Sequence, residues 1–240
     1  LDNFGLVILD QFSDPVDAAD GDSSTIDTFR LQGVRTGDDD CIIDCSNELI
    51  DALEAVFTQK VTDDGLNQLI LAARIPWAAV DMIRGYLGYA KQLNLRYSTV
   101  RIEEILLAQP ELVQGLWQLF HTRFDPTLQG DRNKATNKIR EAIEAQLRDL
   151  RAQDQEITFR TIFNLIDSTL RTNFYRTDRI EHYISFKVDC SKVWKMPEPR
   201  MLYEVYVHHP EMEGVHLRGG QIARGGIRWS DRQDYRREVQ

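Results

Sequence analysis

The stretch FNLIDSTLRTNFYRTDRIEHYISFKVD, residues 163–189, decides the fold, because the spacing of its apolar residues changes within it. Its first half belongs to a run, residues 156–175, in which apolar residues recur every four positions. These are Ile162, Ile166, Leu170 and Phe174. Such spacing places the four side chains on one face of a helix. The sequence therefore predicts a helix over residues 156–175.

After about Thr177 the apolar period shortens to two. The segment HYISFKVD, residues 182–189, places Ile184, Phe186 and Val188 on one face, which is the alternation of a strand. A sheet is therefore predicted to begin near residue 182. It continues in LYEVYVHH (202–209), where Tyr203, Val205 and Val207 lie on one side, and in GVHLRG (214–219) as a third short strand.

Ahead of this transition, residues 63–175 are predicted to be helical nearly throughout. Ser98 and Pro110 are typical first residues of helices, and Pro76 suits a first turn. The predicted helices span residues 63–74, 76–93, 98–108, 110–124, 131–152 and 156–175. Their apolar stripes predict a packed helical domain, and the aromatic residues are assigned to its core.

The first 58 residues predict two strands and one helix. The strands are expected at residues 4–12 and 25–32, and the helix, opening on an N-cap serine, at residues 46–57. Polar segments at residues 14–24 and 36–40 are expected to be a loop and a turn. This order is that of the back half of a small α/β module. Overall, the predicted fold class is α+β, mostly α, with a helical domain between that partial module and the first strands of an incomplete α/β domain.

Charge and cysteine content limit the class of protein. The 240 residues carry a net charge of −9, with −13 on residues 1–64 and +4 on residues 65–240. An odd number of cysteines argues against a disulfide framework, and Cys41 and Cys45 lack further ligands for zinc, so no metal site is expected. No apolar run is long enough for a membrane span. A cytoplasmic protein is predicted.

The segment HLRGGQIARGGIRWSDR, residues 216–232, is the candidate binding site. Paired glycines allow the backbone to approach a ligand closely, and arginines match carboxylate or phosphate with two hydrogen bonds. Ser230 and Gln233 have the spacing of a helix-capping box, so a helix is expected to follow this anion-binding loop. The residues alone leave open a tight hairpin with solvated arginines. Nucleic-acid binding is a further alternative, disfavoured by the net charge.

The segment EGVHLRGGQIARGGIRWSDRQDYRREV, residues 213–239, resembles the start of the catalytic domain in the large NAD-specific glutamate dehydrogenases of bacteria. Upstream segments are similar to the family's helical region, and residues 1–12 to the end of one of its small ACT-like modules. The resemblance implies three parts: the end of an ACT-like module (1–60), a helical domain (61–178) and the truncated start of the catalytic, substrate-binding domain (179–240).

The resemblance implies a reaction, the NAD-dependent oxidation of L-glutamate to 2-oxoglutarate and ammonia, which is a step of amino-acid catabolism. Arg224 stands where smaller glutamate dehydrogenases carry a lysine that contacts the substrate's side-chain carboxylate. Arg224, Gly225 and Gly226 are therefore predicted to bind that carboxylate, with Arg228 as a further candidate. Catalytic lysines and the NAD-binding domain are expected beyond Gln240, so no catalytic or cofactor-binding residue is assigned within the chain.

The same resemblance implies a homo-oligomer, with a possible amino-acid effector at the ACT-like modules, and a chain that is inactive alone. The alternative functions are a non-enzymatic regulatory or assembly module and, as a weaker one, an arginine-rich nucleic-acid-binding protein. His121 is expected to cap a helix or face solvent. His208, His209 and His216 lie near the glycine pairs, but strand alternation separates two of them across faces.

Overall fold

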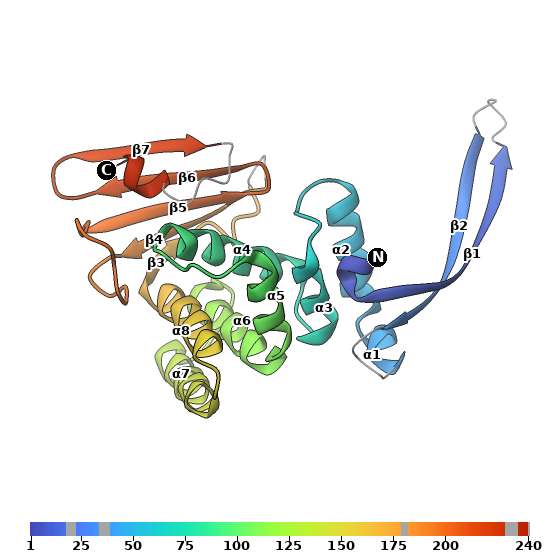
Figure 1. The fold of residues 1–240 in the computed structure, drawn as a ribbon, viewed down its shortest axis with the longest axis horizontal. Helices are drawn as coiled ribbons and strands as arrows, with labels where there is room; N and C mark the ends of the chain where they lie inside the picture. Colours follow the sequence, from blue (N-terminus) through green and yellow to red (C-terminus); the bar gives the residue numbers. More distant parts are fainter. Residues whose placement is uncertain (18–22, 34–38, 179–181, 229–234, 240) are drawn as a thin grey trace.

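In a computed structural model, the structure describes residues 1–17, 23–33, 39–178, 182–228 and 235–239. A helical body carries a five-stranded sheet at one end and a long two-stranded hairpin at the other (Figure 1). The α+β, mostly α prediction is confirmed. Among the helices of the described residues, none combines the length and the apolarity needed to cross a bilayer.

The amino-terminal hairpin consists of β1 (Leu6–Asp17) and β2 (Ser23–Gly33), which pair antiparallel and follow the short 3-10 helix η1 (Asp2–Phe4). Both strands were predicted, but they run further than expected, through most of the polar segment 14–24. The reason is the pairing itself, since Pro15 lies opposite Thr25 and the ladder continues to Asp17 and Ser23.

Two helices connect the hairpin to the body. The first, α1 (Asp39–Asp44), was not predicted, and part of the turn expected at residues 36–40 lies outside the described residues. The second, α2 (Ser46–Phe57), was predicted with the correct bounds. Its N-cap is Cys45 rather than Ser46, and no side chain caps it.

The body contains five longer helical elements, preceded by a short pair. That pair, η2 (Gly65–Gln68) and α3 (Leu69–Ala72), replaces the single helix expected over residues 63–74, because Asp64 caps a 3-10 turn by accepting a hydrogen bond from the Leu66 amide. Ser98 and Pro110 begin helices as predicted, and the Ser98 hydroxyl accepts from the Arg101 amide at 3.2 Å. The longer helices are α4 (Trp77–Gln92), α5 (Thr99–Leu107), α6 (Pro110–Phe124), α7 (Arg132–Asp149) and α8 (Gln153–Ser168).

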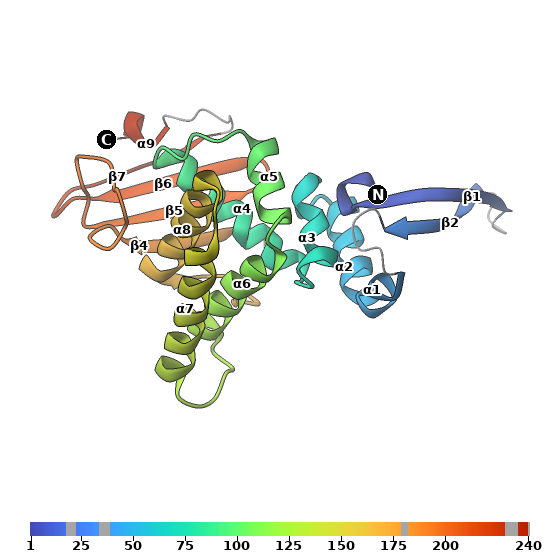
Figure 2. The same cartoon turned by 60° about the horizontal axis from the view of Figure 1, so that its bottom comes forward.

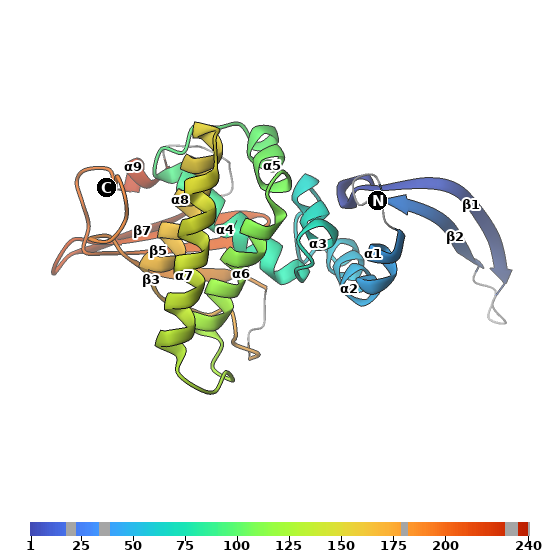
Figure 3. The ribbon, with the colours of Figure 1, turned by 90° about the horizontal axis from the view of Figure 1, so that it is seen from below.

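The sheet has the order β3-β4-β5-β6-β7 and is antiparallel throughout. Helices α4 and α8 pack against one of its faces, as Figures 2 and 3 show. Its strands are β3 (Thr169–Thr172), β4 (Ile184–Asp189), β5 (Tyr203–His209), β6 (Met212–Arg218) and β7 (Ala223–Arg228).

Helix α4 is the centre of the core and joins the helices to the sheet. Tyr86 stacks on Phe186 of β4 at a ring-centroid distance of 4.0 Å and meets Phe120 of α6 edge-on. Gly85 makes this approach possible, because a Cβ at that position would lie 2.7 Å from a Phe186 ring carbon. All three rings are fully buried, so they contribute much of the apolar area removed from water.

The end of α8 corrects the sequence prediction of a helix to residue 175. The helix stops at Ser168, and the chain turns into β3, where Leu170 is 41% exposed. Arg123 donates hydrogen bonds to the carbonyls of Ile166 and Thr169, and the Tyr86 and Thr169 hydroxyls are hydrogen-bonded at 2.9 Å. These contacts, together with pairing to β4, replace the helical hydrogen bonds that a continued helix would make.

The face of β5 that packs on the helices is its polar one. Ile184, Phe186 and Val188 of β4 are buried, as the alternation predicted. On β5, however, Glu204, Tyr206 and His208 point inward, while Tyr203, Val205 and Val207 share the opposite face. A buried glutamate and a buried histidine require partners, and those partners define the sites below.

Candidate functional site

The segment with the two glycine pairs is a β-hairpin rather than the loop that the sequence predicted. The first pair lies in the turn between β6 and β7, where Gly220 has a φ of 146°, a conformation that side chains disfavour. The second pair lies within β7, where Leu217 is opposite Arg224 and Val215 is opposite Gly226. The hairpin alternative, which the residues alone left open, is therefore the observed structure.

Strand geometry divides the predicted binding residues between two faces of the sheet. Directly opposed residues share a face, so Arg224 and Gly226 lie on the helix-covered face with Leu217 and Val215. Gly225 lies on the other face opposite His216, and a Cβ there would come within 3.1 Å of the His216 ring. The structure thus brings Arg224 and Gly226 together and turns the open side of Gly225 away from them.

Arg224 lines a hollow at the end of the hairpin. The hollow has a volume of about 410 Å³. Its walls are Met201, Leu217, Gly219, Gln221, Ile222 and Arg224. The side chain of Arg224 is exposed, and the surroundings are mainly apolar. A cation at the edge of an apolar hollow suits a ligand with a short hydrocarbon part and a carboxylate.

The other part of the predicted site lies largely outside the described residues. The backbone of Arg228 ends β7, but its side chain is not described, and Ser230, Asp231, Gln233 and Asp234 fall within residues 229–234, which are not described either. The capping box and the role of the Arg228 side chain in binding the carboxylate therefore stay predictions. The chain is described again in α9 (Tyr235–Val239), and a helix in this position was expected.

A buried ion pair fixes α9 to the sheet. The Arg236 guanidinium donates to the Glu204 carboxylate through Nε at 2.9 Å and through Nη2 at 2.6 Å. Tyr89 of α4 donates its hydroxyl hydrogen to the same carboxylate at 2.7 Å. The Arg236 amide donates to Gln92 at 2.9 Å. Arg236 is 3% exposed and Glu204 is 0% exposed, so the two charges depend on one another.

The surroundings of Tyr89 and Arg236 raise the pKa of both groups. Burial raises the pKa of Tyr89 well above its usual value, and the negative charge of Glu204 adds to the effect, so the hydroxyl keeps its proton and donates. Burial alone would lower the pKa of Arg236, but hydrogen bonding to Glu204 outweighs it and the pKa is raised.

The positions of three arginines bear on the nucleic-acid alternative. Arg236 is buried, and Arg218 and Arg224 lie on opposite faces of the sheet. Arg218, Arg224 and Arg236 therefore do not form one basic surface for nucleic acid.

A second buried cluster joins α4 to the sheet through Asp81, which is 1% exposed. His182 and His208 each place Nε2 near one carboxylate oxygen of Asp81, at 2.9 and 3.0 Å. Burial works to raise the pKa of Asp81, but the hydrogen bonds from the two histidines hold it well below its usual range. The described residues contain no group of three or more His, Cys, Asp and Glu arranged to hold a metal ion.

His121 and the buried thiols have structural surroundings. His121 lies in the last turn of α6, where Nδ1 is 2.8 Å from the Tyr175 hydroxyl and Nε2 is 3.5 Å from the Asp125 carboxylate. Cys45 and Cys190 are buried free cysteines, and burial raises the pKa of the Cys190 thiol to about 12. None of these groups lines the hollow beside Arg224.

Two family models match separate parts of the chain. A family model described as the catalytic domain of bacterial NAD-glutamate dehydrogenase matches residues 142–240. A second model, glutamate dehydrogenase helical motif 3, matches residues 61–126. The chain belongs to the bacterial NAD-glutamate dehydrogenase family. The sheet that carries Arg224 lies within the catalytic-domain match, and α4, α5 and α6 lie within the helical-motif match.

Curated relatives extend the likeness to the whole chain. NAD-specific glutamate dehydrogenases from Halomonas elongata and Pseudomonas aeruginosa are each 35% identical to it over 100% of its length. The protein of that name from Mycobacterium tuberculosis is 34% identical over 81% of the chain. The chain spans only about 15% of the length of the first two relatives and 12% of the third.

Sequence reasoning missed both buried polar clusters of this family member. Glu204 and His208 alternate with apolar residues in LYEVYVHH, a pattern that usually places charged residues in solvent. Asp81 lies 127 residues from His208, and Arg236 lies 32 residues from Glu204, so no local spacing links the partners of either cluster. The only sequence signal is the charged Asp81 within the otherwise apolar PWAAVDMI, residues 76–83.

We expect Arg236→Met to lower the free energy of unfolding by about 3–5 kcal/mol, because it leaves the Glu204 carboxylate buried without its countercharge. Arg237→Met is the matched control, since Arg237 is the exposed neighbour on the same helix, and it should change stability by less than about 0.5 kcal/mol. Urea unfolding followed by circular dichroism measures both. Equal effects of the two substitutions would contradict the buried ion pair.

For Asp81→Asn we expect a loss of about 2–4 kcal/mol at pH 7, because the histidines lose a charged acceptor. The pKa of Asp81 is lowered in the folded state, so its contribution is complete above the unfolded-state pKa near 4 and is lost as pH falls below it. The difference from the unsubstituted protein should therefore narrow between about pH 5 and pH 3. A difference that stays constant over this range would rule out the ionised carboxylate as its source.

Proposed function

We propose that this chain is the segment of an NAD-dependent glutamate dehydrogenase that binds the side-chain carboxylate of L-glutamate. The reaction is the oxidation of L-glutamate to 2-oxoglutarate and ammonia with reduction of NAD. The observation that carries the proposal is the position of Arg224. It lines an apolar hollow within the stretch that matches the family's catalytic domain.

The hollow suits the substrate in shape and charge. A guanidinium can hold a carboxylate with two parallel hydrogen bonds. Met201, Leu217 and Ile222 offer apolar surface for the two methylene groups between that carboxylate and the α-carbon. Gly226, on the same face as Arg224, adds no side chain that would compete for the space. Fixing the distal end in this way would orient the α-carbon for hydride transfer.

Gly225 and Arg228 have narrower parts in the proposal. Among the described strands, β7 pairs only with β6, and alternate residues of an edge strand direct their amides away from the ladder. Gly225 would contribute through its backbone, since its open side faces His216. Arg228 stays a further candidate for binding a carboxylate; its backbone lies opposite Glu213, four residues along β7 from Arg224.

The residues of this chain do not fit the nicotinamide dinucleotide. Binding of that cofactor needs a glycine-rich turn between a strand and a helix, of the form G-x-G-x-x-G. The sequence contains no such spacing, since its glycine pairs are adjacent rather than alternate. NAD is therefore assigned to another part of the full-length protein. What this chain contributes to the reaction is substrate binding and orientation.

The remaining parts of the proposal concern organisation. We retain the division into an ACT-like end (1–60), a helical domain (61–178) and the start of a catalytic domain (179–240), although the catalytic-domain match already begins at residue 142 within α7. A cytoplasmic homo-oligomer with an amino-acid effector at the ACT-like modules belongs to the same proposal. The dehydrogenase names of the relatives favour neither the purely regulatory nor the nucleic-acid alternative.

In the full-length protein, we expect Arg224→Ala to raise the KM for L-glutamate about 10- to 100-fold, because a charge-assisted hydrogen-bonded pair contributes about 1.5–3 kcal/mol. The KM for NAD should not change. The KM of Arg224→Lys for L-glutamate should lie between those of the unsubstituted protein and Arg224→Ala. Arg171→Ala, an exposed arginine on β3 of the same sheet, is the matched control. Steady-state kinetics with L-glutamate as the varied substrate gives the values, and an unaltered KM in Arg224→Ala would refute the assignment.

The isolated 240-residue chain is expected to be inactive, because it lacks the dinucleotide-binding turn. Absorbance at the wavelength of reduced nicotinamide, with L-glutamate and NAD present, measures this directly. The full-length protein at the same concentration of sites serves as the positive control. NADH production by the chain alone that is lost in Arg224→Ala would show that the assignment of NAD binding to another part of the full-length protein is wrong.

A further inference from the structure

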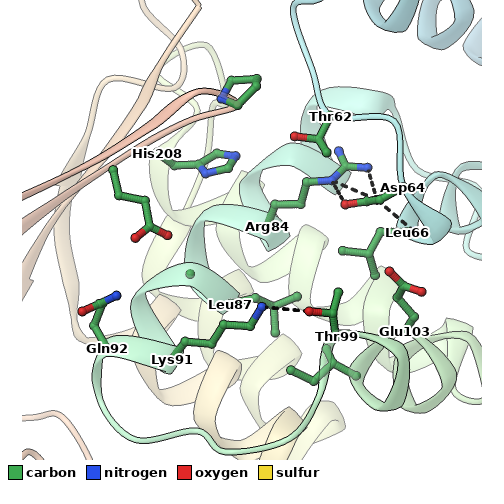
Figure 4. A pocket seen from close by; sticks show the side chains of 14 residues that line it. Thr62, Asp64, Leu66, Arg84, Leu87, Lys91, Gln92, Thr99, Glu103 and His208 are labelled. Carbon is green, nitrogen blue, oxygen red and sulfur yellow. Dashed lines mark hydrogen bonds and ion pairs between the residues drawn. The ribbon is translucent and has the colours of Figure 1, made fainter. Parts of the chain in front are cut away.

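A second pocket lies where the helical motif meets the sheet, and the proposed substrate-binding residues take no part in it. It has a volume of about 410 Å³. Its walls come from the segment around η2, from α4 and α5, and from the hairpin of β5 and β6. Figure 4 shows Lys91, Thr99 and Glu103 on the helical side of this pocket and His208 on the strand side. Its size is that of a small-molecule site.

One end of the pocket offers a cation and a hydroxyl. The Lys91 ammonium donates a hydrogen bond to the Thr99 hydroxyl at 3.2 Å (Figure 4). Lys91 is half-buried, and within the part of the chain that the structure describes it forms no ion pair. An ammonium and a hydroxyl held side by side are suitable donors for a ligand carboxylate.

Carboxylates occupy two other positions, and a glycine makes room for each. A Cβ on Gly65 would lie 2.7 Å from the Glu103 carboxylate, and a Cβ on Gly88 would lie 2.9 Å from that of Glu213. Burial raises the pKa of Glu103, and the nearby Asp64 charge adds to it. A cationic ligand group beside Glu103 would relieve both effects.

The remaining charged groups of the wall are already engaged with one another. Arg84 donates to Asp64 at 2.7 Å through Nη2, and the same nitrogen donates to Asn67 at 2.7 Å. This pair therefore shapes the wall. Lys91 and Glu103 both line the same space and form no ion pair with a described residue, although the charges of Arg84 and Lys91 act against the rise in the pKa of Glu103.

We propose that this pocket binds a zwitterionic α-amino acid, with its carboxylate on Lys91 and Thr99 and its ammonium group on Glu103. Glu213 adds negative charge to the walls, which disfavours an acidic side chain. Apolar lining from Leu66, Leu87, Ile102 and Pro210 gives a neutral or basic side chain its contacts. The ligand is thus an amino acid other than the proposed substrate.

The location makes the bound amino acid a bridge between two parts of the chain. Lys91 and Glu103 lie within residues 61–126, the helical-motif match, whereas His208 and Glu213 lie within residues 142–240, the catalytic-domain match. Glu213 is on β6, the strand that pairs with β7 and Arg224. This site is separate from the effector site proposed for the ACT-like modules.

The test uses the full-length protein and a panel of L-amino acids, scored by thermal shift and then by isothermal titration calorimetry. We expect at least one neutral or basic amino acid to bind. Lys91→Met and Glu103→Gln should each weaken its binding at least tenfold, and Lys91→Arg should weaken it less than Lys91→Met. Lys138→Met and Glu144→Gln, exposed positions on α7, are the matched controls and should leave binding unchanged. The Arg224→Ala variant should also retain it.

Comparison of the ligand with its N-acetylated and decarboxylated analogues tests the zwitterion itself, and both should lose binding to the unsubstituted protein. That measurement needs no variant, so it holds even if a substitution impairs folding. No binding by any neutral or basic amino acid would overturn the proposal. So would binding that is insensitive to Lys91 and Glu103 or abolished by Arg224→Ala, or an N-acetylated analogue that binds as well as the parent amino acid.

Discussion

The arrangement of this chain depends on the inward-facing carboxylate of Glu204. It lies in the middle strand of the sheet and is fully buried. Tyr89 of α4 and Arg236 of α9 both donate hydrogen bonds to it. A carboxylate in this position is stable only with a cation and further donors around it. The sheet, the central helix and the last helix are therefore held in one arrangement.

Helix α4 transmits this constraint to the rest of the structure. Along one side it presents Asp81 to the two histidines, Tyr86 to Phe186, and Tyr89 to Glu204. Further around the same helix, Arg84 and Lys91 line the second pocket. The strands that follow β5 take their register from it, so the position of Arg224 on β7 depends indirectly on α4.

The sequence was sufficient to predict secondary structure and burial where local signals and tertiary packing agree. Ser98 and Pro110 begin helices, and Ile184, Phe186 and Val188 are buried, because capping and alternation act over a few residues. It was insufficient at the end of α8. There Leu170 and Phe174 continue the helical spacing, but Arg123 and Tyr86, distant in sequence, provide partners for the backbone and side chain at the turn into β3. The inward face of β5 could not be predicted either, because the partners of Glu204 and His208 are also distant in sequence.

The candidate site was likewise predicted from the sequence only in part. The composition of the glycine- and arginine-rich segment indicated an anion site, but two glycines within a strand are poor evidence for a strand, so the hairpin was only one of two alternatives. The opposite orientations of Arg224 and Gly225 follow from pairing with β6, which the sequence does not specify. The second pocket is assembled from four separate segments of the chain and leaves no local signal.

Hydrogen–deuterium exchange of the full-length protein carrying Tyr89→Phe tests the central role of Glu204 most directly. The substitution removes one donor to the buried carboxylate and keeps the ring. The account predicts faster exchange of backbone amides in β5, β6, β7 and α9 together, with α7 unchanged. Faster exchange confined to α4, with β7 and α9 as protected as before, would contradict it.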